Sequence, residues 1–130
     1  MSPLKPMQIA LDEARKASSQ DEVPVGAVIV HGETGEIIAV AHNEMVRSAN
    51  PTAHAEMLVI QRACMILRKS RLVDYDIYVT LEPCPMCAQA ISFARFRRLH
   101  FGAYDPKAGG VEHGPKIFHS SSCFHQPLTQ

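Results

Sequence analysis

The chain has 130 residues, of which 46% are hydrophobic and 20% are charged, and its 13 basic residues balance its 13 acidic ones. This length is that of one domain with its own core, and the composition is that of a globular chain and excludes a disordered or membrane protein. The balanced charge gives no general attraction to polyanions, so binding to nucleic acid would require a local basic patch.

The apolar stretches of the sequence are short. One of the longest, "VPVGAVIV" at 23–30, falls far below the roughly 20 residues that a membrane-spanning helix needs. The N-terminal segment lacks the apolar stretch of a secretory signal, and Asp12 and Glu13 argue against a transit peptide, which is poor in acidic residues. We therefore expect a cytoplasmic protein without membrane association, whose four cysteines are metal ligands, catalytic groups or core residues rather than disulfides.

The first part of the chain predicts a helix and a hairpin. Apolar residues recur at helical spacing over 7–17, with charged residues between them, which is typical of an amphipathic helix. Two apolar stretches, 23–30 and 36–42, then flank "HGETG", whose two glycines predict a hairpin turn.

The middle of the chain predicts alternating helices and strands. A helix is expected over 53–70, a buried strand over 76–82, a second helix over 85–96 and a further strand over 97–104. This order predicts an α/β domain with a mixed sheet, in which an antiparallel pair lies at one side and strands joined by helical crossovers lie at the other.

The motif "EPCPMC" at 82–87 places Cys84 and Cys87 where the buried strand ends and the next helix begins. Open α/β sheets usually bind their ligands at such a position. By itself, a C-x-x-C motif there is compatible with a redox pair, a structural zinc clip or a catalytic metal site.

The motif "HAE" at 54–56 adds His54 and Glu56 at the start of the preceding helix, thirty residues upstream (84 − 54 = 30). Together with Cys84 and Cys87, His54 would make three zinc ligands, and a catalytic zinc leaves its fourth position to a water whose pKa falls to about 7. Glu56 could then take a proton from that water and pass it to a leaving nitrogen. A structural clip would need a fourth protein ligand, for which the candidates, none at regular spacing, are His100, His113, His119, Cys123 and His125.

These motifs resemble the H-x-E…P-C-x-x-C signature of the zinc-dependent nucleobase deaminases. The stretches "DEVPVGAVIV", "NPTAHAE", "YVTLEPCPMC" and "FGAYDPKAGG" are also similar to those of the bacterial tRNA-specific adenosine deaminases, and together they span 21–110. Bacterial guanine deaminases are similar at "PCPMC" and less so elsewhere.

The resemblance implies a three-layer α/β/α sandwich of the cytidine-deaminase type, with a mixed central sheet and one Zn²⁺ per subunit. It also implies a role for each of several residues. These are the zinc ligands His54, Cys84 and Cys87, the proton carrier Glu56, and the substrate contacts Asn43, Ala55 and Asp105.

The implied reaction is the hydrolytic deamination of adenosine to inosine at the wobble position of a tRNA anticodon loop, with release of ammonia. Family sites lie near a dimer interface, which implies a homodimer. Two alternatives stay open: deamination of a free base or nucleoside, namely guanine, cytosine or cytidine, and an inactive zinc-binding pseudoenzyme or assembly subunit.

The chain is expected to form a single domain over 1–130. Residues 105–130 are rich in Gly, Pro, Ser and His and show no period, so we expect loop there, with one turn of helix near "PKIF". Members of the family continue with a strand and a basic C-terminal helix, and neither is visible in this segment, which ends at Gln130.

Overall fold

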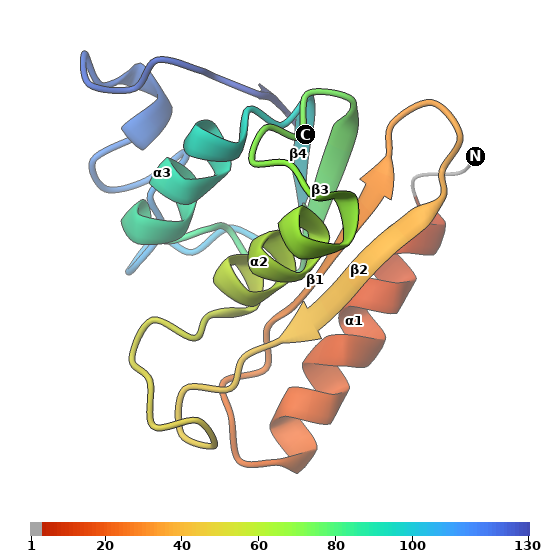
Figure 1. Cartoon of the computed structure of the whole chain (residues 1–130). Helices are drawn as coiled ribbons and strands as arrows, with labels where there is room; N and C mark the ends of the chain where they lie inside the picture. Colours follow the sequence, from red (N-terminus) through yellow and green to blue (C-terminus); the bar gives the residue numbers. More distant parts are fainter. Residues whose placement is uncertain (1–3) are drawn as a thin grey trace.

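The computed structural model describes residues 4–130 and places a mixed sheet between two layers of helices (Figure 1). The sheet has the strand order β2-β1-β3-β4-β5. The strands are β1 (Gly26–His31), β2 (Ile37–His42), β3 (Tyr75–Val79), β4 (Arg98–Phe101) and β5 (Leu128–Thr129). The helices are α1 (Leu4–Ser19), α2 (Ala55–Leu67), α3 (Pro85–Ala94) and the short 3₁₀ helix η1 (Ile117–His119).

The sheet is antiparallel on one side and parallel on the other. Strand β1 pairs antiparallel with both β2 and β3, whereas β4 pairs parallel with β3 and with β5. Helix α3 makes the crossover between the parallel strands β3 and β4, as such a connection requires. The prediction of a mixed sheet with a hairpin at one side is therefore confirmed.

Both faces of the central strands are buried. On one face, the apolar side chains of Ile29, Ile77 and Leu99 join a cluster that includes residues of α2 and α3. On the other face, Val28 and Val30 pack with residues of α1. Because side chains alternate along a strand, each central strand supplies both cores, and the predicted three-layer α/β/α sandwich is confirmed.

Helices α2 and α3 end earlier than the sequence predicts. Helix α2 ends at Leu67 because Arg68 adopts a left-handed conformation with φ of 55°, and α3 ends at Ala94 because Arg95 does so with φ of 63°. Helices usually end at a glycine in this left-handed conformation, so the two arginines did not indicate a helix end in the sequence. Within residues 4–130, none of the helices has the length and apolarity that a membrane crossing requires.

Over 105–130, the expected turn of helix near "PKIF" is present as η1, but the expectation of loop was wrong at Leu128–Thr129. These residues form β5, whose Leu128 pairs with Arg98 and whose Thr129 pairs with Leu99. A strand of two residues has no period of its own and exists only because β4 offers an open edge. The single-domain prediction and the absence of a further helix stay predictions.

Candidate active site

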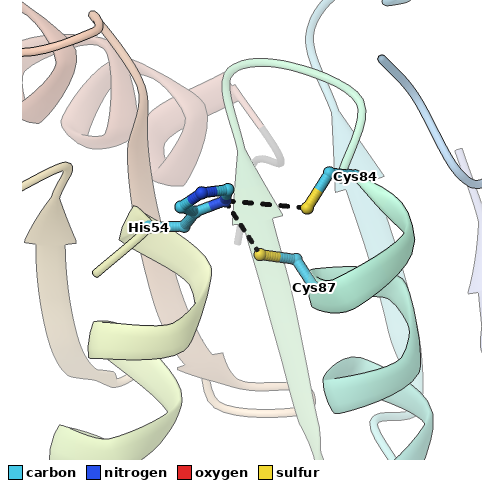
Figure 2. A group of neighbouring side chains, drawn as sticks. All are labelled: His54, Cys84 and Cys87. Carbon is cyan, nitrogen blue, oxygen red and sulfur yellow. Dashed lines mark hydrogen bonds between the residues drawn. The ribbon is translucent and has the colours of Figure 1, made fainter. Parts of the chain in front are cut away.

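The N-termini of α2 and α3 bring three potential metal ligands together. His54 immediately precedes α2, Cys84 immediately precedes α3, and Cys87 lies in the first turn of α3. The Nδ1 atom of His54 lies 3.6 Å from Sγ of Cys84 and 3.5 Å from Sγ of Cys87 (Figure 2). All three donor atoms lie within 4.8 Å of one another.

These distances fit a tetrahedral zinc ion. Zinc bonds of about 2.3 Å to sulfur and about 2.0–2.1 Å to nitrogen, at a tetrahedral angle, place nitrogen and sulfur roughly 3.6 Å apart. The two N–S distances, 3.6 Å and 3.5 Å, agree with this separation. One imidazole and two thiols are also a ligand set that zinc prefers, so the residues present fit the metal.

His54 and Cys84 occupy positions that usually serve another purpose. Each is the N-cap of its helix, where Ser, Thr, Asp or Asn would normally accept a backbone N–H, and neither side chain makes such a bond. Their side chains are free to point toward each other, as Figure 2 shows. The helix dipoles add partial positive charge at this point, which favours thiolate.

The two thiols differ in acidity. The contact with Cys87 lowers the pKa of Cys84 to about 5, with a smaller contribution from His54. The same contact raises the pKa of Cys87, which is completely buried. Metal binding by these residues would require both thiols to lose their protons.

Glu56 lies one residue further into α2 and is only 4% exposed. Burial raises the pKa of its carboxyl to about 7. A carboxyl with a pKa near neutrality can both accept and return a proton, which is the property that a general acid–base catalyst needs.

A pocket of about 200 Å³ opens beside these groups. His54, Glu56 and Cys84 contribute to its lining, and the walls are mainly apolar. The residues that line it are Val23, Val25, Asn43, Met45, His54, Glu56, Leu81, Glu82, Cys84, Asp105 and Ala108. An apolar pocket with a few convergent polar groups is the usual form of a small-molecule site.

Three residues were predicted to contact the substrate, and two of them, Asn43 and Asp105, line this pocket. Among the residues that the structure describes, Ala55 is not part of the lining. Ala55 is completely buried, and its backbone N–H donates to Oδ1 of Asn43 at 2.8 Å. Asp105 uses Oδ1 to accept the N–H of Lys107 and Ala108, which folds the start of its loop. The bond from Ala55 thus fixes the orientation of the Asn43 amide.

Three of the five residues considered as a fourth ligand make hydrogen bonds away from the cluster, and His100 stacks on Tyr78. His113 contacts Glu82, His125 donates to the carbonyl of Phe96, and Cys123 lies beside Ser92. In residues 4–130, the group that shares a metal-binding centre contains three residues, His54, Cys84 and Cys87. A site with three protein ligands is of the open, catalytic kind.

Sequence reasoning did not find the apolar walls. Val23, Met45, Leu81 and Ala108 come from four separate segments and carry no motif that marks them as pocket residues. Glu82 also belongs to the lining and has a fully buried side chain. The signal that could have indicated it was its place directly before the cysteine motif.

Comparison with known proteins agrees with this geometry. Residues 2–103 match the family model described as the cytidine and deoxycytidylate deaminase zinc-binding region. The chain therefore belongs to the cytidine and deoxycytidylate deaminase family. It carries that family's zinc-binding region, and the His54, Cys84 and Cys87 cluster lies within the matched residues.

Individual proteins of the family differ in how similar they are to this chain. The tRNA-specific adenosine deaminase of Agrobacterium fabrum is 53% identical over 93% of this chain and 78% of that protein. A solved structure from a study of A-to-I editing by tRNA:A34 deaminases is 51% identical, with a TM-score of 0.93 over 97% of this chain and 95% of the other. The guanine deaminase of Bacillus subtilis is 37% identical, with a TM-score of 0.75 over 80% of this chain and 66% of the other.

Proposed function

We propose that this protein deaminates adenosine to inosine at the wobble position of a tRNA anticodon loop. Water is consumed, the amino group of the base leaves as ammonia, and a carbonyl takes its place. The relatives named as tRNA-specific adenosine deaminases are more similar in sequence than the guanine deaminase, 53% against 37% identical, and this difference supports adenosine over guanine.

One observation carries the proposal: His54 and Cys84 line the same pocket as Glu56. We propose that His54, Cys84 and Cys87 hold one Zn²⁺ ion per subunit. When bound, the metal would supply Lewis acidity that makes a coordinated water nucleophilic near neutral pH.

Glu56 would handle the protons of the reaction. Its buried carboxylate, with a pKa of about 7, can accept the proton that water loses. It can then return a proton to the amino nitrogen, so that this nitrogen departs as neutral ammonia. We propose that Glu56 is the acid–base catalyst and that it does not bind the metal.

Asn43 would orient the base. Because its Oδ1 accepts the N–H of Ala55, its amide nitrogen is the atom left to donate to an acceptor on the purine ring. We propose that Ala55 acts by holding this amide in place and that Asp105 contributes to the pocket wall next to the nucleotide.

A base can enter a pocket of this kind only when it is unstacked, which is easiest in a single-stranded loop. This requirement supports an anticodon loop as the substrate. We further propose that the protein acts in the cytoplasm as a homodimer, as the resemblance to tRNA-specific deaminases implies.

A substrate panel tests the proposal. The zinc-loaded protein is incubated separately with an anticodon stem-loop that carries adenosine at the wobble position, the same stem-loop with guanosine there, free adenosine, guanine, cytosine and cytidine. We expect ammonia and inosine from the adenosine stem-loop alone.

Each alternative has its own result in this panel. Turnover of guanine, cytosine or cytidine without turnover of the stem-loop would replace the proposal with a free-base or nucleoside deaminase. Absence of turnover with every substrate, in protein that retains zinc, would indicate a pseudoenzyme. The Glu56→Gln variant serves as the blank for contaminating deaminase activity.

A further inference from the structure

The carboxylate of Glu82, at the end of the segment that follows β3, gathers five N–H donors from a distant part of the chain. Its Oε2 accepts the backbone N–H of Val111 at 3.1 Å, Glu112 at 2.9 Å and His113 at 3.1 Å. Its Oε1 accepts the N–H of Asp105 at 3.1 Å and Nδ1–H of His113 at 2.7 Å. The side chain is 0% exposed, so these donors replace its entire hydration shell.

The segment that supplies these donors, residues 105–113, is pressed against the metal-binding turn. The Gly110 N–H donates to the carbonyl of Pro83 at 2.8 Å. A Cβ atom at Gly110 would lie 2.5 Å from the backbone nitrogen of Pro85 and 2.9 Å from the carbonyl carbon of Cys84. One at Gly109 would collide with the Glu82 carboxylate. The two glycines are therefore needed for the segment to lie this close to Cys84.

The same segment forms one wall of the pocket. Asp105 and Ala108 line the cavity together with the apolar residues Val23 and Val25 that precede β1, and Glu82 itself contributes to the lining. Asp105 closes a tight turn, because its carbonyl accepts the Gly109 N–H at 2.8 Å. One carboxylate thus connects the pocket wall with the turn that presents a zinc ligand.

We propose that Glu82 is a positioning residue for the deamination reaction, which holds segment 105–113 against the cysteine turn so that the pocket wall is formed before substrate binds. The proposal rests on the proposed function. Five donors satisfy the roughly four lone-pair sites of a carboxylate, so Glu82 has no free site for a metal ion or for substrate. Its effect passes through Asp105 and Ala108, which belong to the pocket wall, so we expect the effect mainly in the binding of substrate.

Glu82→Gln is the variant that isolates this effect. Its amide oxygen can replace Oε2 and keep the three backbone bonds from Val111, Glu112 and His113. Its NH₂ group cannot accept the N–H of Asp105, and it keeps the contact with the His113 ring only in the other tautomer, in which Nδ1 accepts. In zinc-loaded protein we expect KM for the stem-loop to rise roughly tenfold, the effect of one lost hydrogen bond, with kcat within about threefold of the wild type and zinc content unchanged.

Asp76→Asn is the matched control. Asp76 is also a buried carboxylate of the same region of sheet, and both its oxygens accept bonds from Arg97, at 2.9 Å and 2.8 Å. It is not among the residues that line the pocket in the described chain. We expect this variant to lower the melting temperature at least as much as Glu82→Gln and to leave KM unchanged.

Hydrogen exchange gives a second reading that does not depend on activity. Glu82→Gln should accelerate exchange of the Asp105 amide and of its neighbours through 113, while Asp76→Asn should not. His113→Ala, which removes one donor from the segment side, should have a smaller effect of the same kind, and it decides the matter if Glu82→Gln does not fold.

An unchanged KM together with unchanged exchange over 105–113 would overturn the proposal, and so would an equal rise in KM in the Asp76→Asn control. If the wild-type protein does not deaminate the stem-loop, the proposed function fails by itself. The exchange experiment then still decides whether Glu82 fixes segment 105–113.

Discussion

The candidate metal ligands and the walls of the pocket are built in different ways. His54, Cys84 and Cys87 stand at the first residues of two helices whose positions the sheet determines. The wall residues Met45 and Asp105 lie on loops instead. Each of these loops is held by one buried carboxylate from another part of the chain, Glu22 for the loop of Met45 and Glu82 for the loop of Asp105.

The two carboxylates work alike. Glu22, which is 6% exposed, accepts the backbone N–H of Val46 at 3.0 Å and of Arg47 at 2.7 Å, next to Met45 in the wall. Backbone hydrogen bonds in these loops are scattered, such as that from the Asn50 N–H to the Met45 carbonyl, and the buried carboxylates accept further N–H groups of the loops. This contrast predicts that substitutions in the cluster abolish function, whereas substitutions at the carboxylates adjust binding and stability.

The largest effect is expected from Cys87→Ala. Loss of one of three ligands should reduce zinc affinity by more than the roughly 10- to 100-fold that loss of a ligand's neighbour causes, and turnover should disappear with the metal. Metal content after dialysis against a chelator measures it. The matched control is Cys64→Ala, a half-buried cysteine of α2 outside the cluster, which should retain zinc. Zinc retention in Cys87→Ala would remove Cys87 from the ligand set.

Glu56→Gln is expected to reduce the rate strongly and to leave the zinc site intact, unlike Cys87→Ala. The amide keeps the shape of the side chain but cannot take up a proton, so kcat should fall by about 10²–10⁴-fold while zinc content stays at the wild-type level. Single-turnover rates and metal analysis on one preparation measure both quantities. Normal turnover in this variant would refute the role of Glu56 as the proton carrier.

The smallest expected effect is a pH-dependent loss of stability when Glu22, which holds the loop of Met45, is substituted. The backbone N–H of Arg47 and that of Val46 hold the pKa of Glu22 below its ordinary value of 4.5, although burial acts in the opposite direction. A lowered pKa in the folded state means that ionised Glu22 stabilises the fold above pH 4.5, and this contribution disappears as pH falls through the folded-state pKa.

Glu22→Gln should therefore be less stable than the wild type at pH 7, and the difference should shrink as the pH is lowered below 4.5. Urea unfolding of both proteins across this range measures the difference, and protonation of other groups largely cancels in the comparison. A difference that is constant with pH would mean that the Glu22 charge does not stabilise this loop.

Local signals in the sequence were sufficient for the regular elements. Apolar periodicity predicted α1, α2 and α3 and the strands from β1 to β4, because burial against a sheet or a helix imposes that period on the residues themselves. The C-terminal ends of α2 and α3 were predicted a few residues too late in the sequence. Arg68 and Arg95 end these helices in a left-handed conformation, and a glycine at either position would have indicated the helix end. Strand β5 escaped prediction because only an edge of the sheet creates it.

The sequence by itself determined the zinc-site candidates His54, Cys84, Cys87 and Glu56, since close spacing at helix starts limits where their side chains can point. The tertiary structure alone decided how the pocket is closed. Glu82 and its donors are separated by 23 to 31 residues, and no periodicity connects a carboxylate with backbone N–H groups that far away. Backbone donors carry no sequence signature, so only folding shows which acceptor they meet.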